Sequence, residues 1–338
     1  MKSVLITGGA GFIGSNFTVR MAEWHPEIKL VVLDALTYAG NLDNFPPGFW
    51  DNQNRIFIHG NILDEQLVNR LMADVDGVVH FAAETHVDRS ILDAGRFIDT
   101  DVKGTWVLLE SARRNNIQRF VHISTDEVYG EAPGRPSKEG DDLKPKSPYA
   151  ASKAGADRLV FSYYATYNLP AVITRCSNNY GLYQYPEKLI PLFVTNAFED
   201  KPLPVYGSGL NTRDWIHVDD HCSALEIILF AKGHEGEVFN LSSGEERSVL
   251  DITSIILDAL KKPKELIHHV KDREGHVLRH AVDSSKFRNT FHWAPKADFE
   301  TRIYETVWWY AGNEAWWRKV KERSAEYKEW IEKQYGNR

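Results

Sequence analysis

Short β-branched runs alternate with helix-length segments through the first half of the chain, and this rhythm limits the fold more than any other feature of the sequence. The expected strands are Ser3–Thr7, Leu30–Asp34, Arg55–His59, Gly77–Phe81, Phe120–Ser124 and Ala171–Arg175. The expected helices between them are Ser15–Trp24, Asp64–Ala73, Ile98–Asn115 and Pro148–Asn168. Such alternation implies parallel strands joined by crossover helices, so we predict an α/β fold with a Rossmann-type doubly wound parallel sheet.

The regular alternation of strands and helices ends after about Asn178, where turn-rich stretches interrupt shorter elements. We therefore predict two domains. The first, residues 1–178, carries the Rossmann sheet. The second, residues 179–338, is a smaller mixed α/β domain, and some of its segments return to the sheet.

Composition excludes several classes of protein. The net charge of −7 argues against a general nucleic-acid or anionic-membrane surface. No apolar run approaches the roughly 20 residues that span a bilayer, and the amino terminus has no signal-peptide pattern. Cys176 and Cys222 lie far apart and fit neither a disulfide framework nor a zinc site, so we expect a reducing, cytoplasmic compartment. His217 and His221 have i, i+4 spacing, but we expect structural roles and no metal.

A glycine-rich turn follows the first expected strand. Gly8, Gly11 and Gly14 have G-x-x-G-x-x-G spacing, and a helix is expected to follow. Such glycines allow a tight turn and a close approach of pyrophosphate, which a helix amino terminus then binds. Asp34 ends the second strand 20 residues after Gly14, where a carboxylate accepts hydrogen bonds from a ribose 2′-hydroxyl. The pattern predicts NAD rather than NADP; the alternative is a tight turn with a helix-capping Asp.

Tyr149 and Lys153 follow Pro148 at i, i+4 spacing, so both share one face of a helix that begins there. A lysine cation beside a tyrosine stabilises the phenolate and lowers the tyrosine pKa, which gives a general base. The spacing alone is common and also fits a surface pair. Beside an NAD site, Thr125, Tyr149 and Lys153 predict a group that removes a hydroxyl proton while hydride transfers to nicotinamide.

Two adjacent carboxylates, Asp126 and Glu127, occur in the segment S-T-D-E-V-Y-G at positions 124–130, directly after an apolar strand. Side chains of neighbouring strand residues point to opposite faces. The pair can therefore serve one pocket only if the strand has already ended. The alternative is an ordinary solvated turn.

Nearly the whole chain to about residue 295 resembles the extended short-chain dehydrogenases/reductases, and within them the nucleotide-sugar 4,6-dehydratases, with those acting on dTDP-glucose the closest match. The resemblance lies in G-G-A-G-F-I-G-S-N, D-A-L-T-Y-A-G-N, F-A-A-E-T-H-V-D-R-S, S-T-D-E-V-Y-G, S-P-Y-A-A-S-K, T-R-C-S-N-N-Y-G, Y-P-E-K-L-I-P and R-D-W-I-H-V-D-D-H. It implies a lyase with bound NAD that converts dTDP-glucose to the 4-keto-6-deoxy sugar and water. Glu127 would remove the C5 proton and Asp126, with a raised pKa, would protonate the leaving C6 oxygen.

The resemblance also assigns contacts residue by residue. Further cofactor contacts would be Phe12, Ile13, Leu36, Thr37, Ile62, Ala82, Ala83, Thr100, Tyr149, Lys153 and Asn179. Substrate contacts would be Thr85, His86, Thr125, Asn178, Lys188, Leu189, Pro204, Tyr206, Arg213, Arg273 and His276. Arg213 fits a diphosphate because a guanidinium binds its oxygens through two parallel hydrogen bonds; a salt bridge with Asp214 or Asp219 is the alternative.

The sequence departs from the family pattern at several positions. Asn61 stands where Asp is usual, Asp101 replaces the Asn of the T-N-x-x-G-T motif, and Val249 occupies a position that is commonly Asn. Near the end, G-H-V-L-R-H replaces the more usual G-H-D-x-R-Y. These departures do not affect the prediction of the dehydratase reaction. They leave open whether the nucleotide of the substrate is dTDP or UDP.

Three other functions are compatible with parts of this pattern. A UDP-glucose 4,6-dehydratase would share the whole site, whereas a C4-epimerase or decarboxylase would not need the two carboxylates. A non-catalytic NAD-binding protein would typically lack the tyrosine and lysine pair. In the superfamily the helices that correspond to 98–115 and 148–168 form a four-helix interface, so we expect a homodimer.

Overall fold

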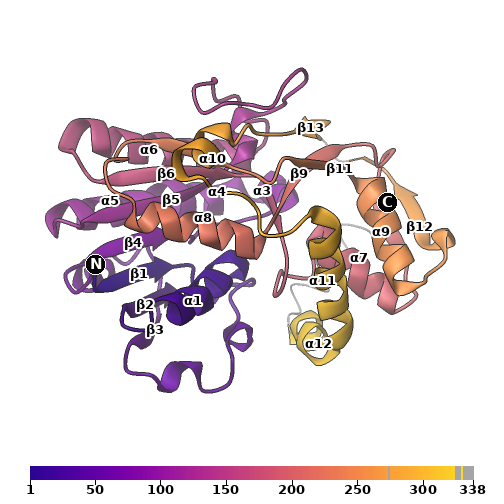
Figure 1. Cartoon of the computed structure of the whole chain (residues 1–338), viewed down its shortest axis with the longest axis horizontal. Helices are drawn as coiled ribbons and strands as arrows, with labels where there is room; N and C mark the ends of the chain where they lie inside the picture. The colour runs from indigo at the N-terminus through magenta and orange to yellow at the C-terminus, as the bar shows by residue number, and fades with distance from the viewer. Residues whose placement is uncertain (273–274, 324–328, 330–338) are drawn as a thin grey trace.

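Within the residues that the computed structural model describes, 1–272, 275–323 and 329, seven parallel strands form a central sheet in the order β10-β6-β5-β4-β1-β2-β3 (Figure 1). The bounds are β1 Ser3–Thr7, β2 Lys29–Asp34, β3 Arg55–His59, β4 Gly77–His80, β5 Arg119–Thr125, β6 Ala171–Cys176 and β10 Val238–Leu241. The predicted α/β doubly wound sheet is confirmed. Strand β10 comes from the second half of the chain and pairs with β6 in parallel.

Helices cover both faces of the sheet because its strands bury side chains on both sides. Val4 and Ile6 of β1 enter one core, and Leu5 between them enters the other. The first core is closed by α1 (Phe12–Trp24), α8 (Val218–Phe230) and α10 (Ser285–Phe291). The second is closed by α2 (Glu65–Met72), α5 (Thr105–Arg114) and α6 (Pro148–Tyr167). This arrangement leaves the carboxyl ends of the strands open for ligands.

The single helix predicted over 98–115 is wrong at its amino-terminal end. The segment follows α3 (Val87–Leu92) and α4 (Ala94–Phe97), winds as the π-helical turn η3 (Ile98–Gly104), and continues as α5. The wide turn carries the buried Asp101, whose carboxylate is held by other elements. Gly104 packs closely on the Ile62 side chain, which would have to move to admit a Cβ there. These tertiary contacts favour the π-helical geometry over the regular one.

The rest of the second half forms a smaller part with its own sheets and core, beside the carboxyl edge of the main sheet (Figure 1). One sheet has the order β11-β9-β13 with β7 also on β9, and a pair joins β12 to β8. The bounds are β7 Asn178–Tyr180, β8 Leu203–Tyr206, β9 Thr212–His217, β11 Glu245–Ser248, β12 Ile267–Val270, β13 Arg279–His280, α7 Leu189–Phe198, α9 Val249–Leu260, α11 Phe299–Gly312 and α12 Glu314–Arg323. Short 3-10 turns are η1 Leu42–Asn44, η2 Phe49–Asp51, η4 Asp126–Tyr129 and η5 Lys264–Leu266.

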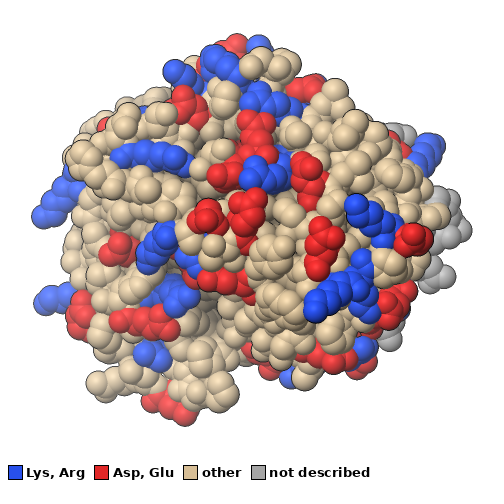
Figure 2. Space-filling model, turned by 45° about the vertical axis from the view of Figure 1, so that its right-hand side comes forward, with Lys and Arg blue, Asp and Glu red and all other residues tan. Residues whose placement is uncertain are grey.

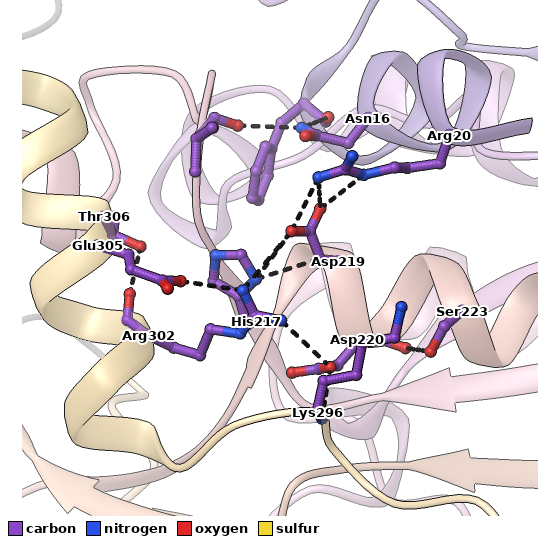
Figure 3. Close-up of polar contacts among 12 residues, drawn as sticks. Asn16, Arg20, His217, Asp219, Asp220, Ser223, Lys296, Arg302, Glu305 and Thr306 are labelled. Atoms are coloured by element: carbon purple, nitrogen blue, oxygen red, sulfur yellow. Dashed lines mark hydrogen bonds and ion pairs between the residues drawn. The ribbon is translucent and has the colours of Figure 1, made fainter. Parts of the chain in front are cut away.

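A cluster of charged side chains ties the second half to the first (Figure 3). Asp219 of α8 accepts hydrogen bonds from the Arg20 guanidinium of α1, through Nε at 3.1 Å and Nη2 at 3.0 Å. Arg302 of α11 lies 3.8 Å from the same carboxylate, and Asp220 accepts a hydrogen bond from the Lys296 backbone N–H at 3.0 Å. Three helices far apart in sequence are therefore held at one point.

The surface mixes both signs of charge. On the face drawn in Figure 2, acidic side chains gather along the middle, and Lys and Arg lie around them. Together with the net charge of −7, this face shows no continuous basic surface of the kind that binds nucleic acid. Among the described helices, none combines the length and the apolar character needed to cross a bilayer.

Candidate active site

One cavity of about 660 Å³ lies at the carboxyl edge of the main sheet and extends to the smaller part of the chain. Its volume is typical of a ligand pocket. Of the predicted site residues that the structure describes, all but Leu36 line it. Leu36 lies behind Asp34 and donates its backbone N–H to the Asp34 carboxylate at 2.8 Å, so its predicted cofactor contact is not seen at the cavity wall. Arg273 lies outside the described residues.

The glycine turn forms the first end of the cavity. Gly8 has φ +66, and a Cβ there would meet the Ala82 backbone nitrogen at 2.5 Å, so only glycine fits. A Cβ on Gly14 would collide with the Gly8 carbonyl oxygen. Helix α1 begins at Phe12 with Gly11 as its N-cap and no side chain on its first N–H groups. The turn is therefore a cradle of backbone for a pyrophosphate.

Asp34 stands beside this cradle at the end of β2. Its Oδ2 accepts from the Ala10 N–H at 2.9 Å and its Oδ1 from Leu36, so the carboxylate is fixed toward the cavity. Burial raises the Asp34 pKa, and these backbone hydrogen bonds oppose the rise. A carboxylate so placed suits a ribose hydroxyl pair and repels a 2′-phosphate. Together with the glycine cradle, the donor set fits NAD.

Tyr149 and Lys153 lie side by side because α6 begins at Pro148. Ser147 caps the helix by accepting from the Ala150 N–H at 3.1 Å. The Lys153 Nζ donates to the Ile123 carbonyl at 2.7 Å, which holds the ammonium group beneath the end of β5. Burial lowers the pKa of Lys153.

The predicted lowering of the Tyr149 pKa is not found in the protein alone. Burial raises this pKa well above its ordinary value, and the charges of Glu127 and Asp101 raise it further. The prediction considered Lys153 but not these two carboxylates, one of which belongs to a segment far from the motif. A positive charge brought by a bound cofactor would act in the opposite direction.

The carboxylate pair lies on the turn η4, directly after β5 ends at Thr125. The Thr125 hydroxyl donates to Asp126 Oδ1 at 3.1 Å and accepts from the Glu127 N–H at 3.3 Å. Because the strand has ended, Asp126 and Glu127 both reach the cavity wall instead of opposite faces of the sheet. The sequence alone left a solvated turn open, and burial of Asp126, which is 2% exposed, excludes it.

The surroundings of Asp126 favour its protonated form. Burial raises its pKa to about 8, and the charges of Glu127 and Asp214 contribute in the same direction. Its Oδ2 is buried without a hydrogen-bond partner among the described residues. The predicted raised pKa is therefore confirmed, and at neutral pH Asp126 is an acid beside a second carboxylate.

A buried network behind the turn fixes its position. The Tyr129 hydroxyl at the end of η4 donates to Asn240 of β10 at 2.8 Å and accepts from Arg175 Nη1 at 2.7 Å. Arg175 also donates from Nε to Asp157 of α6 at 2.8 Å. The turn with both carboxylates is thus joined to strands β6 and β10 and to the helix that carries Tyr149.

Three residues beside the loop after β4 were not anticipated as site residues from the sequence. Glu187 is fully buried and accepts from the Arg89 guanidinium at 2.9 Å. The Arg89 guanidinium also lies over the Tyr38 ring at 3.8 Å, and Tyr38 donates to the Thr85 carbonyl at 2.9 Å. The predicted substrate contact Lys188 donates to the Thr85 hydroxyl at 3.2 Å. The network orders the loop after β4. Its members lie in three of the segments that carry the resemblance, D-A-L-T-Y-A-G-N, F-A-A-E-T-H-V-D-R-S and Y-P-E-K-L-I-P, but no spacing in the sequence joins them.

The cavity is also lined by Asn178, Leu189, Pro204, Tyr206, Arg213 and His276 and by the departure Val249. The departure Asn61 lines it beside Asp34, because the preceding Gly60 donates its N–H to the Asp34 carbonyl at 3.0 Å. Arg213 is held by its contacts to the Thr212 carbonyl at 2.8 Å and the Val277 carbonyl at 3.0 Å. Asp219 is engaged by Arg20, and Asp214 accepts from Ser242. These pairings favour a role for Arg213 at the cavity.

His217 and His221 each have a structural partner. His217 Nδ1 accepts from the Asp219 N–H at 3.3 Å and so caps α8 (Figure 3). His221 Nδ1 lies 2.7 Å from Asn179 Oδ1, and Asn179 lines the cavity. Burial lowers the pKa of His217 to about 4 and that of His221 to about 3, so both are neutral.

Comparison with known proteins identifies the family. The family model described as GDP-mannose 4,6 dehydratase matches residues 5–306. A dTDP-glucose 4,6-dehydratase of Streptomyces niveus is 46% identical over 94% of this chain and 95% of the relative. The low-salt glycan biosynthesis protein Agl12 of Haloferax volcanii is 49% identical over 92% and 99%. The crystal structure of DesIV, a dTDP-glucose 4,6-dehydratase from Streptomyces venezuelae with NAD bound, superposes with a TM-score of 0.91 at 45% identity over 94% and 100%. The chain therefore belongs to the GDP-mannose 4,6-dehydratase family.

Proposed function

We propose that the protein is a dTDP-glucose 4,6-dehydratase, a lyase with bound NAD. The observation that carries this proposal is Asp126, a buried acid beside Glu127 and next to the pair Tyr149 and Lys153 in one cavity. An enzyme that only oxidises and reduces C4 needs Tyr149 and Lys153. Loss of water requires an acid and a base in addition, and Asp126 and Glu127 supply them. The relatives named above support the substrate.

Bound NAD supplies a hydride acceptor that returns the same hydride later in the cycle. Tyr149, supported by Lys153, takes the proton of the sugar C4 hydroxyl as hydride leaves that carbon. The resulting ketone acidifies the C5 proton, and Glu127 removes it. Asp126 gives its proton to the C6 oxygen, which departs as water. Glu127 then returns a proton to C5 as hydride reaches C6, so the product is the 4-keto-6-deoxy sugar.

The nucleotide and the reaction are tested in one assay. The protein is incubated with dTDP-glucose, UDP-glucose and CDP-glucose, and mass spectrometry detects loss of one water. We expect loss of water with dTDP-glucose at the highest kcat/KM. Preference for UDP-glucose would instead favour the alternative substrate. Formation of dTDP-galactose, which has the mass of the substrate and is separated from it by chromatography, would identify a C4-epimerase.

The turnover should fall at alkaline pH because Asp126 must hold its proton. The pKa of this carboxyl is raised to about 8, so the acid form is present below that pH and is lost as pH rises through it. We expect the single-turnover rate of water loss to decrease about tenfold for each pH unit well above 8. A rate that stays constant to pH 10 would contradict the acid role of Asp126.

We also propose that the protein is a homodimer. Six large apolar side chains are exposed on α3, η3, α5 and α6: Ile91, Leu92, Ile98, Trp106, Phe161 and Tyr167. Helices α5 and α6 pack against one another, so two copies of this pair would bury these side chains in a four-helix interface.

Sedimentation velocity at micromolar concentration tests the assembly. We expect a dimer for the wild type and a monomer for Ile98→Glu, because a charge buried in an apolar interface opposes association. Trp308→Glu is the matched control, since Trp308 is exposed on the distant helix α11. A monomeric wild type, or equal dissociation of both variants, would refute the proposed interface.

A further inference from the structure

Asp101 lies behind the wall of the cavity on the π-helical turn η3 and is 1% exposed. Its Oδ1 accepts from the Glu84 N–H at 2.8 Å, and its Oδ2 accepts from the Ser152 hydroxyl at 2.6 Å. Glu84 belongs to the loop after β4, and Ser152 precedes Lys153 on α6. The carboxylate therefore joins a loop of the cavity wall to the helix that carries the proposed base.

Ser152 has one hydroxyl proton and two acceptors. Its Oγ lies 2.6 Å from Asp101 Oδ2 and 2.8 Å from the Tyr149 carbonyl oxygen. With Asp101 ionised, the hydroxyl proton is directed to the carboxylate. A neutral group that donates at this position would leave the Ser152 proton to the Tyr149 carbonyl. The site therefore accepts a charged or a neutral side chain of this shape without losing its hydrogen bonds.

The charge of Asp101 acts on both members of the base. It is the largest of the effects that raise the pKa of Lys153, and it also raises the pKa of Tyr149. Tyr149 and Lys153 lie one turn apart on α6 and both line the cavity. A proton leaves either residue more easily when a nearby negative charge is absent. This direction holds whichever of the two residues releases the proton.

We propose that Asp101 is a positioning residue that retains the proton on the Tyr149–Lys153 pair and moves the working range of this base to higher pH. The inference rests on the proposed function, in which this pair takes the C4 hydroxyl proton. The usual Asn of the T-N-x-x-G-T motif would keep the shape and the hydrogen bonds without the charge. Asp101 thus sets the pH range in which the Tyr149–Lys153 base of this chain works, and an Asn at this position would not do so.

Other charged and titratable groups face the same site, and each stays in place when Asp101 alone is changed. They are Glu84 from the loop after β4, Asp126 and Glu127 from η4, Cys176 from β6, Asp157 from α6, His80 from β4 and His122 from β5. Burial raises the pKa of Asp101 itself to about 6. Its charge is therefore present at neutral pH and is lost as pH falls through about 6.

Asp101→Asn is the test, because its amide oxygen can accept from Glu84 and its amide nitrogen can donate to Ser152. The exposed Asp74→Asn serves as the control for charge removal elsewhere. The proteins with bound NAD are titrated by ultraviolet difference spectroscopy, each against its own Tyr149→Phe derivative. We expect the tyrosinate transition of Asp101→Asn to occur at lower pH than that of the wild type and of Asp74→Asn.

The rate of NADH formation after mixing with dTDP-glucose gives a second readout. At pH values where the rate of NADH formation still rises with pH, the rate of Asp101→Asn should exceed that of the wild type. The excess should be about threefold for each half pH unit by which the pKa of the base is lowered. The difference should vanish below about pH 6, where Asp101 is already neutral. A merely structural role would lower the rate at every pH without shifting the pH profile. Should Asp101→Asn not fold, the smaller neutral Asp101→Ser gives the same comparison.

Coincident titrations of wild type and Asp101→Asn, with product formed by both, would overturn this inference and leave the proposed function intact. Failure of the wild type to act on any of the nucleotide sugars would overturn the proposed function. The tyrosinate titration would still show whether Asp101 controls the pair, because it needs no substrate.

Discussion

Asp126→Asn/Glu127→Gln is expected to oxidise dTDP-glucose at C4 but not to release water, so that NADH accumulates on the enzyme. The amides keep the shape of both side chains and remove the acid and the base. Each group of this kind contributes about 10²- to 10⁴-fold to a rate, so the double variant should lose at least that factor in product formation. Stopped-flow absorbance follows NADH, and mass spectrometry follows loss of water.

The separation of the two steps is the informative part of this experiment. Tyr149 and Lys153 are unchanged in the double variant, so the oxidation step has its full machinery. Asp142→Asn is the matched control, because Asp142 is exposed and its ion pair with Lys144 lies in solvent. Turnover of the double variant at the wild-type rate would refute the assignment of both carboxylates, and loss of NADH formation together with water release would show a damaged site.

Stability measurements distinguish damage from chemistry in Asp126→Asn. The native pKa of about 8 lies far above the ordinary value of 3.8. The folded protein therefore keeps a proton that the unfolded chain releases, and the contribution of this group to stability falls as pH rises from about 4 to 8. The amide removes that penalty. The variant should be at least as stable as the wild type at pH 8 while it is far less active.

Arg175→Met is expected to cause the largest loss of stability, about 3–5 kcal/mol in the free energy of unfolding. Arg175 is 1% exposed, and Asp157 beneath it is fully buried. Without the guanidinium, Asp157 keeps its contact with Arg158 alone, and the Tyr129 hydroxyl loses one of its two partners. Urea unfolding followed by tryptophan fluorescence measures the change.

The neighbouring Arg158 provides the control for this experiment. It contacts the same carboxylate, but its side chain is 46% exposed, so Arg158→Met should cost less than about 1 kcal/mol. Adding Asp157→Asn to Arg175→Met should restore part of the loss, because the unpaired buried charge is then gone. Equal unfolding midpoints for Arg175→Met and Arg158→Met would contradict the account.

The parts of the site that could be predicted from the sequence are those encoded by neighbouring residues. Gly8, Gly14 and Asp34 have fixed spacings along one β–turn–helix–β unit, and Tyr149 and Lys153 share one helical turn. In both cases local geometry carries the function, so the order of residues is sufficient. The position of the two carboxylates after a strand left a solvated turn open, and their roles were predicted only from the resemblance to the dehydratases.

What could not be predicted depends on contacts between distant segments. The raised pKa of Tyr149 arises partly from Asp101, which is 48 residues earlier in the chain and which the π-helical turn brings inward. The Arg89–Glu187 pair joins segments almost 100 residues apart. Both residues lie in segments that carry the resemblance, but no local pattern shows that they form a pair with each other.

Strand β10 has a consequence for biosynthesis on the ribosome. It supplies Asn240 to the Tyr129 hydroxyl and completes the edge of the main sheet beside β6. When residue 178 leaves the exit tunnel, the emerged polypeptide already contains Asp126, Glu127, Tyr149 and Lys153 but not strand β10. The turn η4 reaches its final anchorage only after β10, which ends at Leu241 of 338 residues, has emerged, so maturation of the site is coupled to synthesis of the second half of the chain.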